Sequence, residues 1–119
     1  MQLHQELSAK YFSIFTTADC YFMKPVSNSV YLFNPGNRLS IETIDTLSSD
    51  LAKLLENNDF SKLVIDLHHV TVCDLYGILF LQKAEISATQ KGVELTLKKP
   101  NPIIADTLIN SGYNFNITD

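Results

Sequence analysis

The chain has 119 residues, of which 45% are hydrophobic and 18% charged, and its formal net charge is −4. This length and composition are typical of one folded domain and exclude an intrinsically disordered chain. Because thirteen acidic residues outnumber nine basic ones, the chain lacks the basic surface typical of nucleic-acid binding and matches anionic lipid poorly, so we expect no nucleic-acid partner.

Residues 1–17 form an N-terminal extension that precedes a domain covering residues 18–119. Leu3, Leu7, Tyr11 and Ile14 recur in this extension at helical spacing, which predicts a short amphipathic helix. Such a helix either packs on its own domain or serves as an arm for dimerisation or docking. We favour the first, because a single apolar stripe usually belongs to its own core. A homodimer remains compatible with the second.

Two aromatic, β-favouring runs follow, at residues 20–23 and 30–33. Pro25 and the stretch 27–29 lie between them and are typical of a turn, so the two runs predict an antiparallel hairpin. Pro35 and Gly36 then fit the two central positions of a type II turn that ends the second strand.

A helix is predicted from Ser40, which can cap its first turn. Apolar residues recur there at steps of three and four, a pattern that should face a sheet. This stripe consists of Ile41, Ile44, Leu47, Leu51, Leu54 and Leu55. Residues 57–59 end the helix.

The centre of the chain predicts a strand, a loop and a helix. The short apolar run 63–65 closes at Asp66-Leu67 and is typical of a strand buried on both faces. A linker of residues 68–73 follows. Asp74 is a favoured N-cap, so the next helix should begin there and continue to about Lys91, with its apolar first turns deeply packed.

The C-terminal part predicts one more strand and one more helix. Gly92 suits the end of the preceding helix, and the run 93–97 alternates like a half-exposed strand. Asn101-Pro102 is a helix start, and Gly112 closes that helix. Its buried side is expected to contain Ile103, Ile104, Leu108 and Ile109. Phe115 and Ile117 could add a last strand.

The fold class expected from this order is α/β. A hairpin supplies an antiparallel pair, and the alternating helices and strands that follow imply parallel pairs, so the sheet should be mixed. Sites in open α/β sheets gather where strands end and helices begin. The joint between Asp66 and Asp74 is therefore the place to look for function.

Residues at this joint resemble the central motif of the STAS domain, the module shared by anti-sigma factor antagonists and sulphate-transporter tails. In that family a buried strand ends in Asp-Leu, and a helix opens with Asp-Ser-Ser-Gly after a loop. Asp66-Leu67 and Asp74-Leu75-Tyr76-Gly77-Ile78 occupy those places here, and the resemblance covers residues 18–119. It implies the same mixed-sheet α/β fold. Leu75 stands at the position of the family's phosphorylatable Ser or Thr, so we expect no phosphorylation at the motif.

The resemblance also implies a partner-binding surface around the helix start. Its candidate residues are Arg38, His68, Thr71, Asp74, Leu75, Tyr76 and Gly77. Leu75 and Tyr76 are as consistent with an exposed contact patch as with burial. Gly77, inside a predicted helix, indicates either close packing on the inner strand or contact with a partner.

Other chemistry finds little support in the sequence. The loop contains metal-ligand residue types, but none of the recognised metal-binding spacings, so no metal site is expected. Cys73 precedes a helix start, where the dipole can activate a thiol, yet a small buried cysteine is the favoured interpretation. We expect no catalytic residues, no cofactor and no enzymatic activity.

The expected function is that of a protein-interaction module resembling an anti-sigma factor antagonist in a partner-switching pathway. Its partner would be a regulatory protein kinase or an anti-sigma-factor-like protein. The alternative is an accessory subunit that binds the ATPase of an ABC-type lipid-transport complex. Two unpaired cysteines, no apolar run long enough for a bilayer and no signal peptide indicate a cytoplasmic protein without direct membrane insertion.

Overall fold

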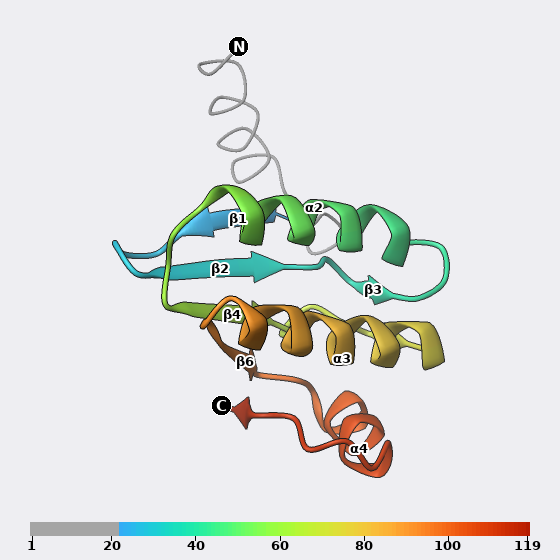
Figure 1. The fold of residues 1–119 in the computed structure, drawn as a ribbon. Helices are drawn as coiled ribbons and strands as arrows, with labels where there is room; N and C mark the ends of the chain where they lie inside the picture. Colours follow the sequence, from blue (N-terminus) through green and yellow to red (C-terminus); the bar gives the residue numbers. More distant parts are fainter. Residues whose placement is uncertain (1–21) are drawn as a thin grey trace.

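The computed structural model describes residues 22–119, which form an α/β domain with helices packed on a twisted sheet (Figure 1). In chain order the elements are β1 (Phe22–Pro25), β2 (Val30–Asn34), β3 (Arg38–Leu39), α2 (Ile44–Asn57), β4 (Lys62–Asp66), β5 (Val72–Cys73), α3 (Leu75–Gln90), β6 (Glu94–Lys98), α4 (Pro102–Asn110) and β7 (Ile117–Thr118). The helix predicted for residues 1–17 lies outside the described residues.

The main sheet has five strands in the order β1-β2-β4-β6-β7. β1 pairs antiparallel with β2, and every later pair is parallel. α2 and α3 lie side by side over one face of this sheet, and α4 lies toward its β6 side (Figure 1). The predicted hairpin and the mixed-sheet α/β fold are therefore confirmed.

The core lies between the sheet and the two helices α2 and α3. Small residues on the inner side of α3 let that helix approach the strands closely, and Phe80 fills the space beside Phe33, with 6.3 Å between the ring centroids. The buried apolar residues are Phe33, Leu39, Leu47, Leu51, Leu54, Leu55, Leu63, Ile65, Leu67, Val70, Phe80, Leu81, Ala84, Ala88, Val93, Leu95, Leu97, Ile104 and Leu108.

Only one face of the central strand is covered by these helices. Leu63 and Ile65 are fully buried against them, but Val64 points to the opposite face and is only half-buried. The sequence predicted burial of this strand on both faces, but within residues 22–119 helices cover only one face, so the prediction is not met there. Its continuous apolar run suggested two covering layers, and α2 and α3 both pack on the same side.

The helix predicted from Ser40 begins later, at Ile44. Residues 40–43 form a turn instead, in which Thr43 N and Ile44 N donate to the carbonyl of Ser40 at 2.9 and 3.0 Å. The Ser40 hydroxyl donates to Glu42 Oε1 at 2.7 Å. Ile41 consequently stands outside the helix and is exposed, whereas the predicted stripe from Leu47 to Leu55 is buried as expected.

Two further differences concern exposed apolar residues. Ile103 and Ile109 were expected on the buried side of α4, but both are exposed, because this helix contacts the domain only along the line of Ile104 and Leu108. The first turns of α3, expected to be deeply packed, expose Leu75 and Tyr76 to solvent.

One predicted turn residue and one predicted helix cap behave as expected. Gly36 has a positive φ of 86°, which the predicted turn needs at this residue, and its N–H donates to Asn34 Oδ1 at 2.9 Å. Asn101 caps α4 by accepting from Ile104 N at 2.9 Å. Its amide also donates to the Val70 carbonyl at 3.0 Å, which ties α4 to the loop that follows β4.

Candidate functional site

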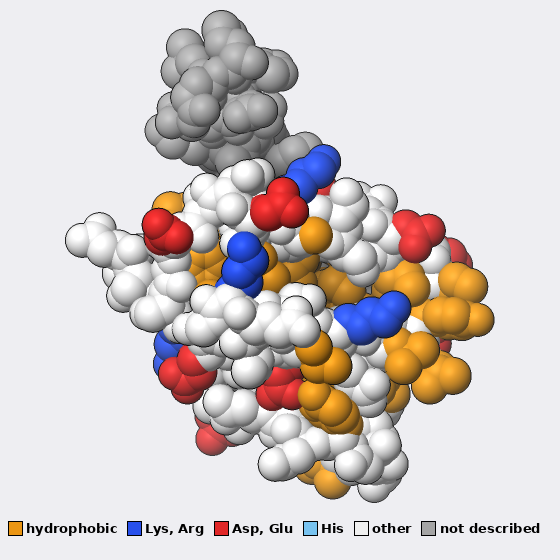
Figure 2. Space-filling view, in the orientation of Figure 1, with side chains coloured by type: hydrophobic (Ala, Val, Ile, Leu, Met, Phe, Trp, Pro, Cys, Tyr) orange, Lys and Arg blue, Asp and Glu red, His pale blue; other side chains and the backbone are white. Residues whose placement is uncertain are grey.

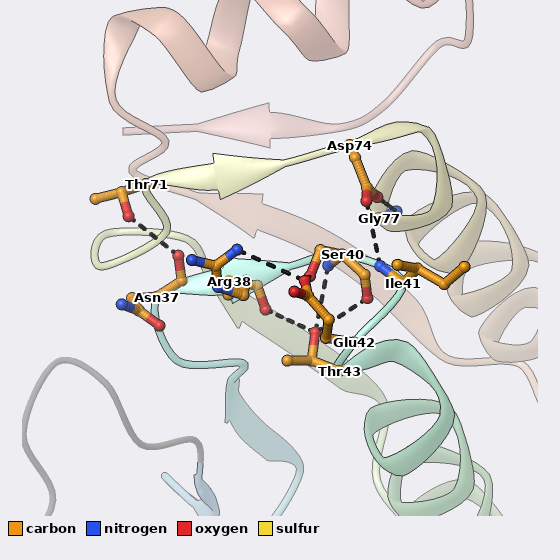
Figure 3. A network of polar contacts seen from close by, with 9 residues as sticks. All are labelled: Asn37, Arg38, Ser40, Ile41, Glu42, Thr43, Thr71, Asp74 and Gly77. Carbon is orange, nitrogen blue, oxygen red and sulfur yellow. Dashed lines mark hydrogen bonds and ion pairs between the residues drawn. The ribbon is translucent and has the colours of Figure 1, made fainter.

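Two segments far apart in the sequence lie side by side at the carboxyl edge of the sheet. β3 and β5, which the sequence did not predict, pair in parallel as a small second sheet. The Asn37 carbonyl accepts from Thr71 N at 2.8 Å and from Val72 N at 3.3 Å, and the Leu39 carbonyl accepts from Asp74 N at 3.1 Å. Figure 3 shows how this brings the turn after β3 against the start of α3.

Asp74 joins these two segments through its side chain. Its Oδ1 accepts from Gly77 N at 3.0 Å, which confirms the predicted N-cap of α3. Its Oδ2 accepts from Ile41 N at 3.2 Å, across the gap between the segments (Figure 3). Because both carboxylate oxygens are engaged by backbone donors, Asp74 fixes the position of Ile41 relative to Leu75 and Tyr76.

Gly77 makes this close approach sterically feasible. It is buried, and a Cβ placed on it would lie 2.8 Å from Leu39 Cβ and closer still to the Leu39 carbonyl oxygen. Close packing therefore accounts for this glycine, although against β3 and not against the inner strand β4. The residue supports the surface from beneath and does not itself reach the solvent.

Four large apolar side chains remain exposed around the contacts that Asp74 makes between the two segments. They are Ile41, Leu75, Tyr76 and Leu79, which we call the apolar cluster. Their exposed fractions are 55%, 66%, 44% and 40%. In Figure 2 a group of hydrophobic side chains gathers at the right edge of the view, over the N-terminal end of α3 and the turn before α2. Of the two alternatives for Leu75 and Tyr76, the structure therefore supports exposure.

The outer side of α3 extends this apolar character along the helix. Because an α-helix has about 3.6 residues per turn, residues 75, 79 and 86 lie on one side of it, opposite the buried Gly77, Phe80 and Ala84. Ile86, 50% exposed, thus continues the line of Leu75 and Leu79. Exposed apolar residues in a row on one helix face typically mark a contact with another molecule.

Polar residues flank the cluster on the β3 side. Arg38 is exposed and places Nη1 3.6 Å from Glu42 Oε1, beside a shallow hollow of about 210 Å³ lined by Pro35, Asn37 and Thr43 among others. Thr71 is exposed as well and donates through Oγ1 to the Asn37 carbonyl at 3.3 Å. The structure thus brings together Arg38 and Thr71, two of the candidate partner-binding residues.

His68 is held differently from Arg38 and Thr71. It follows the end of β4, where its N–H donates to Asp66 Oδ1 at 3.0 Å. Its ring packs edge-on against His69, with the centroids 4.8 Å apart. His68 is exposed, and the contacts that hold it come from its sequence neighbours and not from the β3 turn.

Cys73 lies beneath the cluster, half-buried between β3 and α3. Burial raises the pKa of its thiol to about 11, and the nearby Asp74 carboxylate adds to this effect. Burial therefore outweighs any activation by the helix dipole, and the thiol stays protonated at neutral pH. Within residues 22–119, no group of three or more His, Cys, Asp or Glu side chains is placed to hold a metal ion.

Sequence reasoning missed two members of the cluster. Ile41 was assigned to the buried stripe of α2, and Leu79 to the packed start of α3. The pattern gave one usable signal, since α3 is apolar on more sides than one layer of packing can cover. The exposure of Ile41 depends on the late start of α2, which no comparable sequence pattern indicates.

The chain belongs to the STAS domain family, whose model matches residues 21–118. Solved structures with this fold include the anti-sigma factor antagonist SpoIIAA of Bacillus in its unphosphorylated form, with a TM-score of 0.74 and 10% identity over 84% of this chain and 87% of that one. RsbS of Moorella thermoacetica, in a variant form, gives 0.71 and 18% identity over 82% and 85%.

A murine anion transporter of the solute carrier 26 family is also similar, with a TM-score of 0.63 and 18% identity over 71% of this chain but 14% of the transporter. At these identities the likeness shows the fold alone. No match was found among curated protein sequences. None of the helices in residues 22–119 has the length and hydropathy that a membrane span needs.

Proposed function

We propose that this protein is a non-enzymatic interaction module that binds a protein partner through the apolar cluster, in the manner of an anti-sigma factor antagonist. The observation that carries the proposal is the exposure of Ile41, Leu75, Tyr76 and Leu79 at the helix start of the STAS motif. Apolar and aromatic side chains exposed together on a folded surface are the usual anchors of protein interfaces.

The surface is organised before a partner arrives. Asp74 fixes the turn and the helix start to each other, and Gly77 lets β3 pack directly against α3. Leu75 and Tyr76 lie in a regular helix, so few backbone degrees of freedom remain to be lost on binding. Preorganisation of this kind increases affinity because it lowers the entropic cost of association.

Binding at this surface would not be switched by phosphorylation of the motif. Leu75 directly follows Asp74 and has no hydroxyl to accept a phosphate. A phosphate there would place about two negative charges inside an apolar contact, which disrupts docking. With Leu75 in this position the protein would act as a permanently unphosphorylated form.

The partner class we favour is a regulatory protein kinase or an anti-sigma-factor-like protein. With such a partner, the protein would act in the cytoplasm and in the control of transcription. SpoIIAA and RsbS support this choice by their fold. The second candidate is an accessory subunit that binds the ATPase of an ABC-type lipid transporter. It is favoured by Leu75, which stands at the position of the family's phosphorylatable residue, because such a subunit needs no phosphorylation switch. Genes adjacent to this one distinguish the two, since they would encode a kinase and phosphatase or a permease and ATPase.

The direct test is affinity capture of the partner from the native cell, followed by binding measurements with Leu75→Asp. Leu75 is exposed in the first turn of α3, where a carboxylate interacts favourably with the helix dipole, so the fold should tolerate the change. Docking should lose about 2 kcal/mol, because an unpaired charge must be desolvated, and this is well over tenfold in affinity.

Gln90→Asp is the matched control, since it adds the same charge to an exposed residue in the last turn of α3. Its affinity for the captured partner should stay within a factor of two or so of the parent. If Leu75→Asp melts like the parent and binds equally well, the apolar cluster is not the interface and the proposal fails.

A further inference from the structure

The face of the sheet opposite α2 and α3 has an apolar floor. Leu32, Val64 and Thr96 lie in register across β2, β4 and β6. Together with Val26 and Val30 they line a groove of about 450 Å³. Within residues 22–119, the helices α2 and α3 both pack on the other face, as Figure 1 shows.

The charges that line this groove have one sign. Lys24, Lys62 and Lys98 stand at its margin, and no carboxylate of residues 22–119 lines it. Glu94 and Asp66, the partners of Lys62 and Lys98 in the strand register, stay outside the lining. None of the three ammonium groups is in an ion pair with another described residue. In a chain with thirteen acidic and nine basic residues, this margin is a local reversal of charge that would attract a negatively charged partner.

The strands indicate which shape of partner fits the groove. β2 and β4 contain continuous apolar runs, at residues 30–33 and 63–65, which are typical of strands that helices cover on both faces. An added strand fits less well. At one edge of the sheet β1 ends in Pro25, which has no N–H to donate, and at the other edge β7 has only two residues. The groove therefore suits a helix that lies flat on the sheet.

We propose that this groove is a second docking surface, which binds an amphipathic helix of a partner protein whose apolar stripe is flanked by Asp and Glu. The stripe would cover Leu32 and Val64, and the flanking carboxylates would pair with the three lysines. Five strands about 4.8 Å apart make the sheet about 19 Å wide, which a helix of about 13 residues spans at about 1.5 Å per residue. The apolar cluster lies on α3 and the turn before α2, so the two surfaces do not overlap.

Two other occupants match these charges less well. A second copy of the chain, docked face to face about a two-fold axis, would place one lysine margin against the other, and like charges oppose association. An anionic membrane would repel a chain whose net charge is −4. An acidic helix has neither disadvantage.

The test uses the full-length protein and two model peptides of about 18 residues, each with one leucine stripe. One peptide has glutamate on both flanks of the stripe, and the other has lysine there. In spectra of ¹⁵N-labelled protein, the glutamate peptide should shift the amide resonances of Leu32, Val64 and Thr96 and leave those of Leu75 and Tyr76 unchanged. Fluorescence anisotropy should show that the lysine peptide binds about tenfold more weakly or worse, because its charges face the lysine margin.

Lys24→Glu combined with Lys98→Glu should reverse this preference, because carboxylates then border the groove. Lys53→Glu combined with Lys83→Glu is the matched control: it makes the same change in net charge at exposed residues of α2 and α3 and should leave the preference unchanged. Thermal unfolding of both double variants checks that they remain folded.

The proposal is overturned if the unmodified protein binds both peptides alike or neither of them, or if the shifts fall on Leu75 and Tyr76. Phosphatidylglycerol vesicles provide the last comparison. If they sediment the full-length protein but not the Lys24→Glu, Lys98→Glu variant, the groove binds a membrane, and the proposal is overturned as well.

Discussion

Replacement of Gly77 by alanine tests whether the contact between β3 and α3 supports the fold. The new methyl group would lie 2.8 Å from Leu39 Cβ and nearer still to the Leu39 carbonyl oxygen. This obstacle is backbone, and the same oxygen accepts from Asp74 N at 3.1 Å, so β3 cannot yield without straining that hydrogen bond. Alanine gains about 1 kcal/mol of helix propensity over glycine, but overpacking of this kind costs about 3 kcal/mol.

The net expectation is a loss of about 2 kcal/mol of unfolding free energy, which corresponds to a fall of about 10 °C in Tm for a domain of this size. Thermal unfolding followed by circular dichroism measures it. Thr89→Ala, at an exposed position of the same helix, is the control, and it should leave Tm unchanged or slightly raised. If Gly77→Ala melts at or above the parent temperature, β3 does not constrain α3 and the reasoning is refuted.

Three further predictions concern the same joint. Asp74→Ala removes the oxygens that accept from Gly77 N and Ile41 N, so the unfolding free energy measured by chemical denaturation should fall by about 2 kcal/mol, and Asp74→Asn should recover about half of this loss. A loss within error of zero would show that Asp74 does not hold the two segments together. In a Cys20→Ser protein, alkylation of Cys73 should rise tenfold per pH unit without levelling up to about pH 9.5, because burial raises the pKa of this thiol from 9.0 to about 11; a plateau near pH 8 would contradict this. For the same reason the neutral thiol's contribution to stability is present below pH 9 and is lost as the pH rises toward 11. Intact-mass and peptide analysis of protein from its host should find no phosphate between Thr71 and Tyr76, and a stoichiometric phosphate there would overturn the inference from Leu75.

The elements that could be predicted are those set by local chemistry. Asp74 and Asn101 cap their helices as expected, because a carboxylate or amide oxygen before a helical run can accept from an N–H group of the first turn. Gly36 takes the positive φ that its turn needs. The burial of Leu47, Leu51 and Leu54 follows from their spacing alone. Each of these depends on neighbours within a few residues.

What could not be predicted depends on partners far along the chain. β3 and β5 have two residues each and exist because the Asn37 and Leu39 carbonyls meet N–H groups from residues 71–74. Ile41 is exposed because Ser40 and Thr43 form a turn where helix propensity alone favours a longer α2. Ile103 and Ile109 are exposed because α4 touches the domain along a single line. In each case long-range geometry decides between local alternatives of similar energy.

The position of Leu75 shows how the two kinds of information combine. The sequence of α3 has apolar residues on more sides than one layer of packing can bury, and their spacing does not show which of them belong to the core. The structure separates them: Gly77, Phe80 and Ala84 face the sheet, and Leu75, Leu79 and Ile86 face solvent. Three large aliphatic side chains exposed in one row do not stabilise the isolated domain, because apolar surface contributes favourable free energy only when it is removed from water. A partner that binds as proposed would cover this row, and it would contact the helix first at Leu75, directly after the N-cap Asp74.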